Sequence, residues 1–155
     1  MTSVNTGVFT RSGLTGVVII ILGLLIQCRK NVFDDVEFIS GIWTLEKLTW
    51  EQNQVEISIP PEMKGFRQNV EFKSSGIYLK TTTDIWNDTT WTETGFWSVK
   101  NHEFSFQPEN GEIETGPYLL IDDVLKITLP MKMAIDESGI LKTIPVTREY
   151  SKQEP

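Results

Sequence analysis

The sequence has little of the chemistry that most enzymes and nucleic-acid-binding proteins use. Its 155 residues include one cysteine, Cys28, and one histidine, His102. A single cysteine excludes an internal disulfide and a thiolate zinc site. Fourteen basic against 21 acidic residues give a net charge of −7, which argues against a nucleic-acid partner, since binding phosphates requires many cations. Apolar residues make up 39% of the chain, enough for one folded domain.

Long hydrophobic runs are also scarce. The one strongly apolar run covers the thirteen residues 14–26 and is interrupted only by one threonine and two glycines. A membrane-spanning helix needs about 20 apolar residues, whereas the apolar region of a secretory signal has about 7–15. The length therefore indicates a secretory signal.

The end of this run, Leu25-Ile26-Gln27-Cys28, resembles a bacterial lipoprotein signal, in which a leucine lies three residues before a cysteine. The resemblance implies cleavage before Cys28, acylation of its thiol by chains such as palmitate, and a lipid anchor in the cell envelope. We expect an outer-membrane protein that faces the periplasm or the cell surface. An uncleaved signal anchor and simple secretion are the alternatives. The expected parts are a signal peptide (1–27), a tether (28–38) and one domain (39–152).

The domain shows the alternation of an all-β protein. Short runs of alternating apolar and polar residues recur between turn residues every 8–12 positions, without sustained helical spacing. The eight predicted strands are Ile39–Trp50, Asn69–Lys73, Ile77–Thr83, Thr90–Val99, His102–Gln107, Glu112–Ile121, Val124–Leu129 and Leu141–Lys152.

Short connections make neighbouring strands antiparallel, because a parallel pair needs a crossover of a dozen residues or more. Eight such strands in order leave two exposed edges unless the first strand pairs with the last. We therefore predict an eight-stranded antiparallel up-and-down barrel, with an interior that holds side chains or one small ligand.

Three short motifs carry a family resemblance. Gly41-Ile42-Trp43 in the first strand, Gly95-Phe96-Trp97, and the closing Thr147-Arg148-Glu149-Tyr150 resemble the lipocalin-like lipoproteins of Bacteroidota-type bacteria. The resemblance covers residues 39–152. It implies that Trp43 closes one end of the barrel and that Arg148 packs across its ring, a contact worth roughly 0.5–2 kcal/mol. The sequence lacks the disulfide of extracellular lipocalins, and residues 131–139 read as a linker.

The strand alternation predicts which residues face the interior. The expected interior set is Trp43, Leu45, Val70, Phe72, Leu79, Trp91, Trp97, Phe104, Phe106, Leu119 and Leu125. Glu93 is the one charge on an inward phase, so it either faces water near a barrel end or anchors a ligand in a pocket. The expected ligand-binding residues are Trp43, Phe72, Leu79, Trp91, Glu93, Trp97, Phe104 and Arg148, with Arg67 as a further candidate. Met63, Phe66 and Trp86 are predicted in loops at the barrel mouth.

Two function classes remain open. The first is a lipid-anchored binding protein for a small apolar or amphipathic molecule. The second is a structural or interaction lipoprotein whose barrel is filled by its own side chains, with an unknown protein partner. We expect no enzyme, cofactor or metal, because no nucleophile motif accompanies His102, and Asp122-Asp123 reads as a hairpin turn.

Overall fold

A computed structural model describes residues 32–134 and 140–154. The predicted signal peptide, the lipidation residue Cys28 and most of the 131–139 linker lie outside these ranges. Within them, no helix is long and apolar enough to span a membrane. The fold is all-β, and one short α-helix, α2 (Val32–Ile39), precedes the strands.

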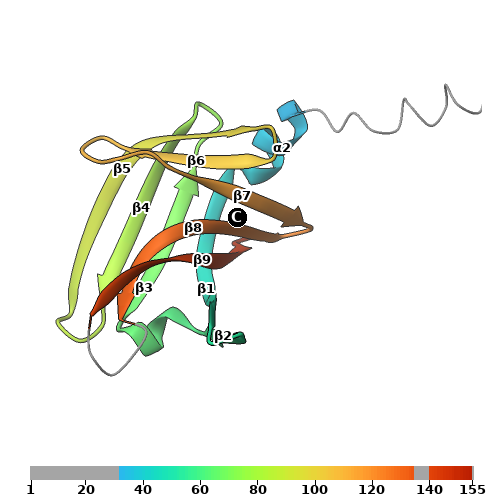
Figure 1. The fold of residues 1–155 in the computed structure, drawn as a ribbon. Coiled ribbons are helices and arrows are strands. Elements are labelled where there is room, and N and C mark those ends of the chain that lie inside the picture. The colour runs from blue at the N-terminus through green and yellow to red at the C-terminus, as the bar shows by residue number, and fades with distance from the viewer. Residues whose placement is uncertain (1–31, 135–139, 155) are drawn as a thin grey trace, which may run out of the picture. The chain divides into compact units, whose positions relative to one another are not determined.

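Eight antiparallel strands form a closed barrel, as the sequence predicts (Figure 1). Consecutive strands pair in chain order from β3 onward, and β1 pairs with both β3 and β9. Trp43–Thr49 of β1 lie opposite Thr147–Lys152 of β9, which removes both edges of the sheet. The barrel strands are β1 (Gly41–Gln52), β3 (Phe66–Phe72), β4 (Ile77–Asp84), β5 (Thr89–Lys100), β6 (Glu103–Pro108), β7 (Glu114–Ile121), β8 (Val124–Ala134) and β9 (Leu141–Lys152).

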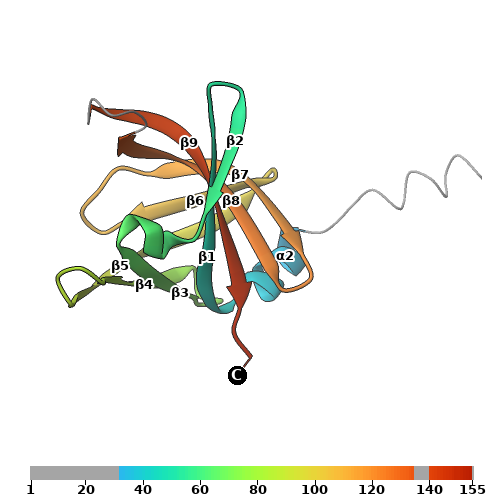
Figure 2. The same ribbon diagram turned by 90° about the horizontal axis from the view of Figure 1, so that it is seen from below.

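A ninth strand, β2 (Val55–Ile59), was not predicted. It pairs with the second half of β1, and together they project from the barrel as a hairpin (Figure 2). Asn53 and Gln54 form the tight turn, with φ of 53° and 64°. This turn has the positive φ angles of a type I′ hairpin but lacks the glycine that usually marks one. A 3₁₀ helix, η1 (Pro61–Lys64), then leads into β3.

Helix α2 occupies part of the expected tether and lies at one end of the barrel. This end is called the closed end below, because packed side chains fill it, and the opposite end is called the open end. Its last carbonyl groups are bound by residues from the barrel: Trp43 Nε1 donates to the Ile39 carbonyl at 2.7 Å. Lys152 Nζ donates to the Phe38 carbonyl, also at 2.7 Å. Tyr118 on β7 donates to the buried Asp35 at 2.6 Å. The bonds from Trp43 and Lys152 satisfy carbonyls that a helix end leaves unpaired, and Lys152 places a cation where the helix dipole favours one.

The basic residue that packs over Trp43 is Lys152, not Arg148. Lys152 Nζ lies 5.4 Å from the centre of the Trp43 ring. The register of β1 and β9 explains the correction, because it sets Trp43 opposite Lys152 and places Arg148 opposite Leu48, farther along the barrel. The predicted contact between first and last strands is therefore made, but by a different residue.

The closed half of the barrel is filled by packed aromatic rings. The centroid of Phe72 lies 5.2 Å from that of Trp97 and 5.3 Å from that of Phe104. Trp97 and Phe104 stack with an interplanar angle of 14°. Phe106 packs edge-on against Tyr78. These rings, with Trp43, are almost fully buried and form the aromatic part of a core that also contains aliphatic side chains such as Leu125 and Ile127.

Leu79 and Leu119 were assigned to the wrong face. On β4 the buried residues are Tyr78 and Thr82, so the alternation of a strand turns Leu79 outward. On β7, Leu119 is 52% exposed, while its neighbours Tyr118 and Leu120 pack against the core. Both strands were predicted correctly, but in each of them the side chains predicted to face outward are the ones that face the core.

Candidate functional site

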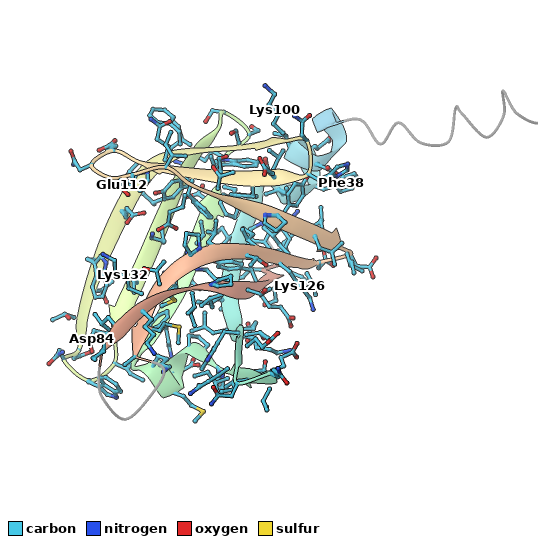
Figure 3. The ribbon with its side chains drawn as sticks, in the orientation of Figure 1. Phe38, Asp84, Lys100, Glu112, Lys126 and Lys132 are labelled. Carbon is cyan, nitrogen blue, oxygen red and sulfur yellow. The ribbon has the colours of Figure 1, made fainter. Side chains whose placement is uncertain are left out.

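The end of the barrel away from α2 contains a pocket of about 390 Å³. Figure 3 shows this separation, with Phe38 of α2 near one end and Asp84 near the other. Strands β3, β4 and β5 form the wall, and η1 with the β4–β5 loop forms the rim. The lining residues are Lys64, Gly65, Phe66, Gln68, Lys80, Thr82, Asp84, Trp86, Trp91 and Glu93.

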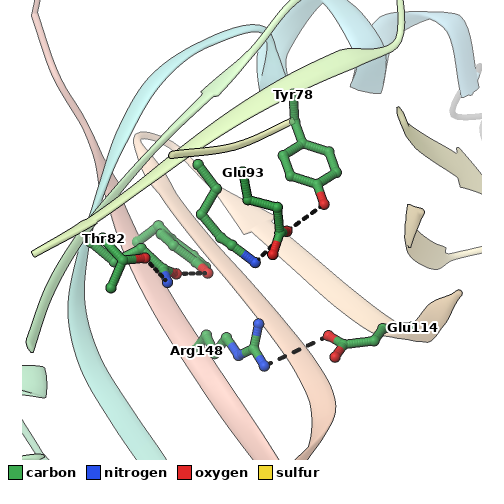
Figure 4. A network of polar contacts seen from close by, with 8 residues as sticks. Tyr78, Thr82, Glu93, Glu114 and Arg148 are labelled. Atoms are coloured by element: carbon green, nitrogen blue, oxygen red, sulfur yellow. Dashed lines mark hydrogen bonds and ion pairs between the residues drawn. The ribbon is translucent and has the colours of Figure 1, made fainter. Parts of the chain in front are cut away.

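Glu93 is the centre of a polar network in this wall (Figure 4). Its Oε1 atom lies 2.6 Å from Lys80 Nζ and accepts a 2.6 Å hydrogen bond from the Tyr78 hydroxyl. Burial alone would raise the pKa of Glu93, but the contacts with Lys80 and Tyr78 and the charge of Arg148 outweigh it. The pKa therefore lies below its ordinary value of 4.5, and Glu93 is ionised at neutral pH.

A second branch of polar side chains lies beside Glu93. Gln68 Nε2 donates to Thr82 Oγ1 at 3.1 Å, and the Tyr150 hydroxyl donates to Gln68 Oε1 at 3.3 Å. Gln68 is therefore fixed in one orientation by partners on two other strands (Figure 4). Burial raises the pKa of Tyr150, as burial and the bond to Glu93 raise that of Tyr78, so both hydroxyls stay protonated donors.

A larger opening of about 670 Å³ lies between β7 and β8. The two strands pair only where Tyr118–Ile121 meet Val124–Ile127, and they diverge beyond that segment. Next to the paired segment, the backbones of β7 and β8 approach closely at Gly116 and Thr128. Only glycine fits there, since a Cβ at residue 116 would lie 1.9 Å from the Thr128 carbonyl oxygen.

Arg148 and Glu114 face each other inside this opening, with Nη2 and Oε2 3.7 Å apart (Figure 4). Glu93 lines both hollows, so the two meet at its side chain. The polar, accessible part of the open half is therefore the wall around Glu93, whereas β1, β8 and β9 contribute buried apolar side chains such as Leu48, Leu129 and Val146.

Trp86 is fixed in position although it is 73% exposed. Its indole ring lies flat on Gly65, where a Cβ would come within 2.6–2.7 Å of three ring atoms. Gly65 also has φ of 86°, which favours glycine. The loop that carries Trp86 is held by Asp84, whose Oδ1 accepts the backbone N–H groups of Trp86 and Asn87 at 2.9 and 3.0 Å. Ile85 N–H donates to the Gly65 carbonyl at 2.9 Å, which ties the loop to the start of β3.

The predicted site residues fall into separate groups in the structure. Trp91, Glu93, Phe66 and Trp86 line the pocket, and Arg148 lines the lateral opening. Met63 is 67% exposed on η1, and Arg67 is exposed and pairs with Glu62 at 3.2 Å. The others do not gather there: Leu79 faces outward, and the closed half contains Trp43, Phe72, Trp97 and Phe104.

The sequence reasoning missed most of the polar network. The inward assignment of Leu79 implies that Tyr78, Lys80 and Thr82 face outward, and no sequence pattern singles out Gln68 or Glu114. The available signal was Glu93, because an inward carboxylate needs a cation or hydrogen-bond donors opposite it. Lys80 lies directly across from Glu93 in the β4–β5 register and supplies that cation.

His102, predicted as the first residue of a strand, lies instead in the turn before β6, with φ of 63°. Asp122 lies in the turn between β7 and β8, as predicted, with φ of 49°. Across the described ranges, no group of three His, Cys, Asp or Glu side chains is arranged to hold a metal ion.

Comparisons with known proteins leave the family open. No family model matches the chain, and no curated protein matches it. Among solved structures, the crystal structure of Rv2717c from M. tuberculosis is similar, with 13% sequence identity and a TM-score of 0.43. The match covers 79% of this chain and 98% of that protein.

Proposed function

We propose that this chain is a lipocalin-like lipoprotein of the bacterial cell envelope that binds a small amphipathic molecule at the open end of its barrel. The observation that carries the proposal is the pocket of about 390 Å³, in which the aromatic rim residues Trp86 and Trp91 adjoin the Lys80–Glu93 pair. Small-molecule sites combine apolar contact surface with fixed polar groups, and here the rings of Phe66, Trp86 and Trp91 supply the apolar surface beside a polar wall.

The packing of the barrel limits where the ligand lies. The aromatic residues of the closed half contact one another, so the ligand occupies the open half instead. Trp91 is 50% exposed beside the half-buried Glu93, and it offers apolar surface next to a charged pair. An amphipathic molecule matches both surfaces at once, because its apolar part covers the rings and its polar part meets the pair.

The proposal is tested by calorimetric titration of the purified protein with sodium laurate, an amphipathic probe. We expect saturable 1:1 binding, weakened by about tenfold in Trp91→Ala, since truncating a buried aromatic contact costs 1–2 kcal/mol or more. Phe96→Ala is the matched control, because Phe96 lies on the outer face of the same strand and is 57% exposed. Equal weakening in both variants, or binding that both leave unchanged, would contradict a site at the open end.

The lipid anchor is tested separately, on Cys28. Removal of residues 1–27 from the 155-residue chain leaves 128 residues. In a host that processes lipoproteins, intact-mass spectrometry should detect a chain that begins at Cys28 and carries added acyl mass. Cys28→Ser should lose that mass and leave the membrane fraction. An unmodified cysteine in a full-length or differently cleaved chain would refute the anchor.

The packed aromatic core favours one alternative, a barrel that serves as a scaffold for protein contacts. That reading is supported if laurate and other small probes fail to bind while the protein copurifies with a defined envelope protein.

A further inference from the structure

The rim of the pocket presents one flat aromatic surface that is already ordered. One face of the Trp86 indole covers Gly65, and the ring is 73% exposed in total. Two hydrogen bonds to Asp84 and the bond from Ile85 to Gly65 hold its loop. An exposed ring on a constrained loop loses little conformational freedom when a ligand stacks on it.

Beneath this surface, donors and acceptors are arranged around the pocket wall. The Lys80 ammonium has three N–H donors, one of which meets Glu93 Oε1, and Glu93 Oε2 is a further acceptor. Thr82 accepts from Gln68 and still has its hydroxyl hydrogen to donate. The pocket therefore offers both donors and acceptors at fixed positions.

The charges that line the pocket cancel. Two cations, Lys64 and Lys80, are matched by two anions, Asp84 and Glu93. A ligand with several charges of one sign would gain no net attraction there, and a wholly apolar one would cover the Lys80–Glu93 pair and remove water from it without replacing its hydrogen bonds. The lining favours a neutral ligand with many hydrogen-bonding groups and one apolar face.

We propose that the pocket takes a neutral saccharide of two or more units, with one pyranose ring stacked on Trp86 and hydroxyl groups of the next unit or units bound to Lys80 and Glu93, which lie four residues deeper along β4 and β5 than the strand ends that carry the Trp86 loop. A pyranose has an apolar C–H face and an edge of hydroxyls that both donate and accept, which matches the ring and the polar wall. The inference rests on the proposed function, because it identifies the chemical class of ligand for the same pocket.

The test uses the purified protein with three neutral trisaccharides as probes: maltotriose, cellotriose and triacetylchitotriose. Calorimetric titration should detect saturable binding of at least one of them. Trp86→Ala should weaken that binding by about tenfold or more, and Lys80→Met should weaken it as well. Because Trp86 is largely exposed, its removal leaves the core intact, and thermal unfolding verifies that the variant folds. Phe96→Ala, on the outer face, should bind as the parent does.

The outcomes distinguish the saccharide inference from the proposed function. Binding of none of the three trisaccharides overturns the inference, as does binding that Trp86→Ala leaves unchanged. If laurate binds in a Trp91-dependent manner while the trisaccharides do not, only the saccharide inference fails and the proposed function stands. If neither class of probe binds, both fail.

Discussion

The ammonium group of Lys152, the last residue of β9, lies over the indole ring of Trp43 near the start of β1, 5.4 Å from its centre. The same ammonium donates to the Phe38 carbonyl at the end of α2. One lysine thus joins the first strand, the last strand and the helix at the closed end of the barrel. Arg148, which the family resemblance favours for this role, instead faces the open half.

Lys152→Met should therefore lower stability while it keeps most of the apolar stem. A cation over an aromatic ring contributes roughly 0.5–2 kcal/mol, and a cation at a helix C-terminus 0.3–1 kcal/mol. We expect a loss of about 1–2 kcal/mol in the free energy of unfolding, measured by urea denaturation. Lys132→Met, at an exposed position of β8, is the control and should change stability by less than about 0.5 kcal/mol. A Lys152→Met variant as stable as this control would show that the contact contributes nothing.

The Glu93 network predicts a loss of stability in acid. The folded-state pKa of Glu93 is lower than in the unfolded chain, so its contribution is complete above the ordinary pKa of 4.5. It is lost as the pH falls below that value toward the folded-state pKa. In urea titrations at a series of pH values, Glu93→Gln should show a shallower fall in stability below pH 4.5 than the parent. An identical pH profile for the two proteins would mean that Glu93 is not ionised and paired.

The tyrosines make the opposite prediction at high pH. The chain has three, and burial raises the pKa of each, with the Glu93 contact adding to the shift of Tyr78 and the Asp35 contact to that of Tyr118. Their stabilising contribution is complete below the unfolded pKa of 10.0 and is lost as the pH rises above it. Ultraviolet absorbance should therefore show little tyrosinate until the protein unfolds. Gradual ionisation near pH 10 in the folded protein would contradict the burial of these hydroxyls.

Gly116→Ala should be among the most damaging single-methyl substitutions in the barrel. Its Cβ would lie 1.9 Å from the Thr128 carbonyl oxygen, a backbone atom that cannot move aside without shifting β8. Overpacking of this kind costs typically 1–3 kcal/mol and sometimes more. Gly111→Ala, in the β6–β7 loop, has its nearest contact at 3.1 Å with a proline side chain and is the matched control. Thermal unfolding of both variants tests the prediction, which equal melting temperatures would refute.

The barrel was predictable from the sequence because period-2 alternation and short turns require antiparallel neighbours, and closure removes exposed edges. The inward face of β4 was not, because both phases of that strand carry large side chains. Apolar Ile77 and Leu79 suggested one face, whereas the structure buries Tyr78 and brings Lys80 inward to Glu93. A lysine that faces inward is recognisable only with its partner, which depends on the register of two strands.

The contact that supports the Trp86 ring could not be predicted from the sequence either. Trp86 was recognised as a loop residue at the mouth, but its support by Gly65 joins two loops that are distant in sequence. Alternation within one strand contains no information about such a contact. Likewise, the close approach of Gly116 to the Thr128 carbonyl joins two neighbouring strands and cannot be read from the alternation within either one.

The most direct test of the account is the position of a bound ligand relative to the five tryptophans. Each indole N–H gives its own signal in a ¹H–¹⁵N NMR spectrum, which can be assigned with single Trp→Phe variants. During titration with laurate, or with a trisaccharide that binds, the signals of Trp86 and Trp91 should shift while those of Trp43 and Trp97 stay in place. Shifts of Trp43 and Trp97 with Trp86 and Trp91 unmoved would contradict a binding site at the open end.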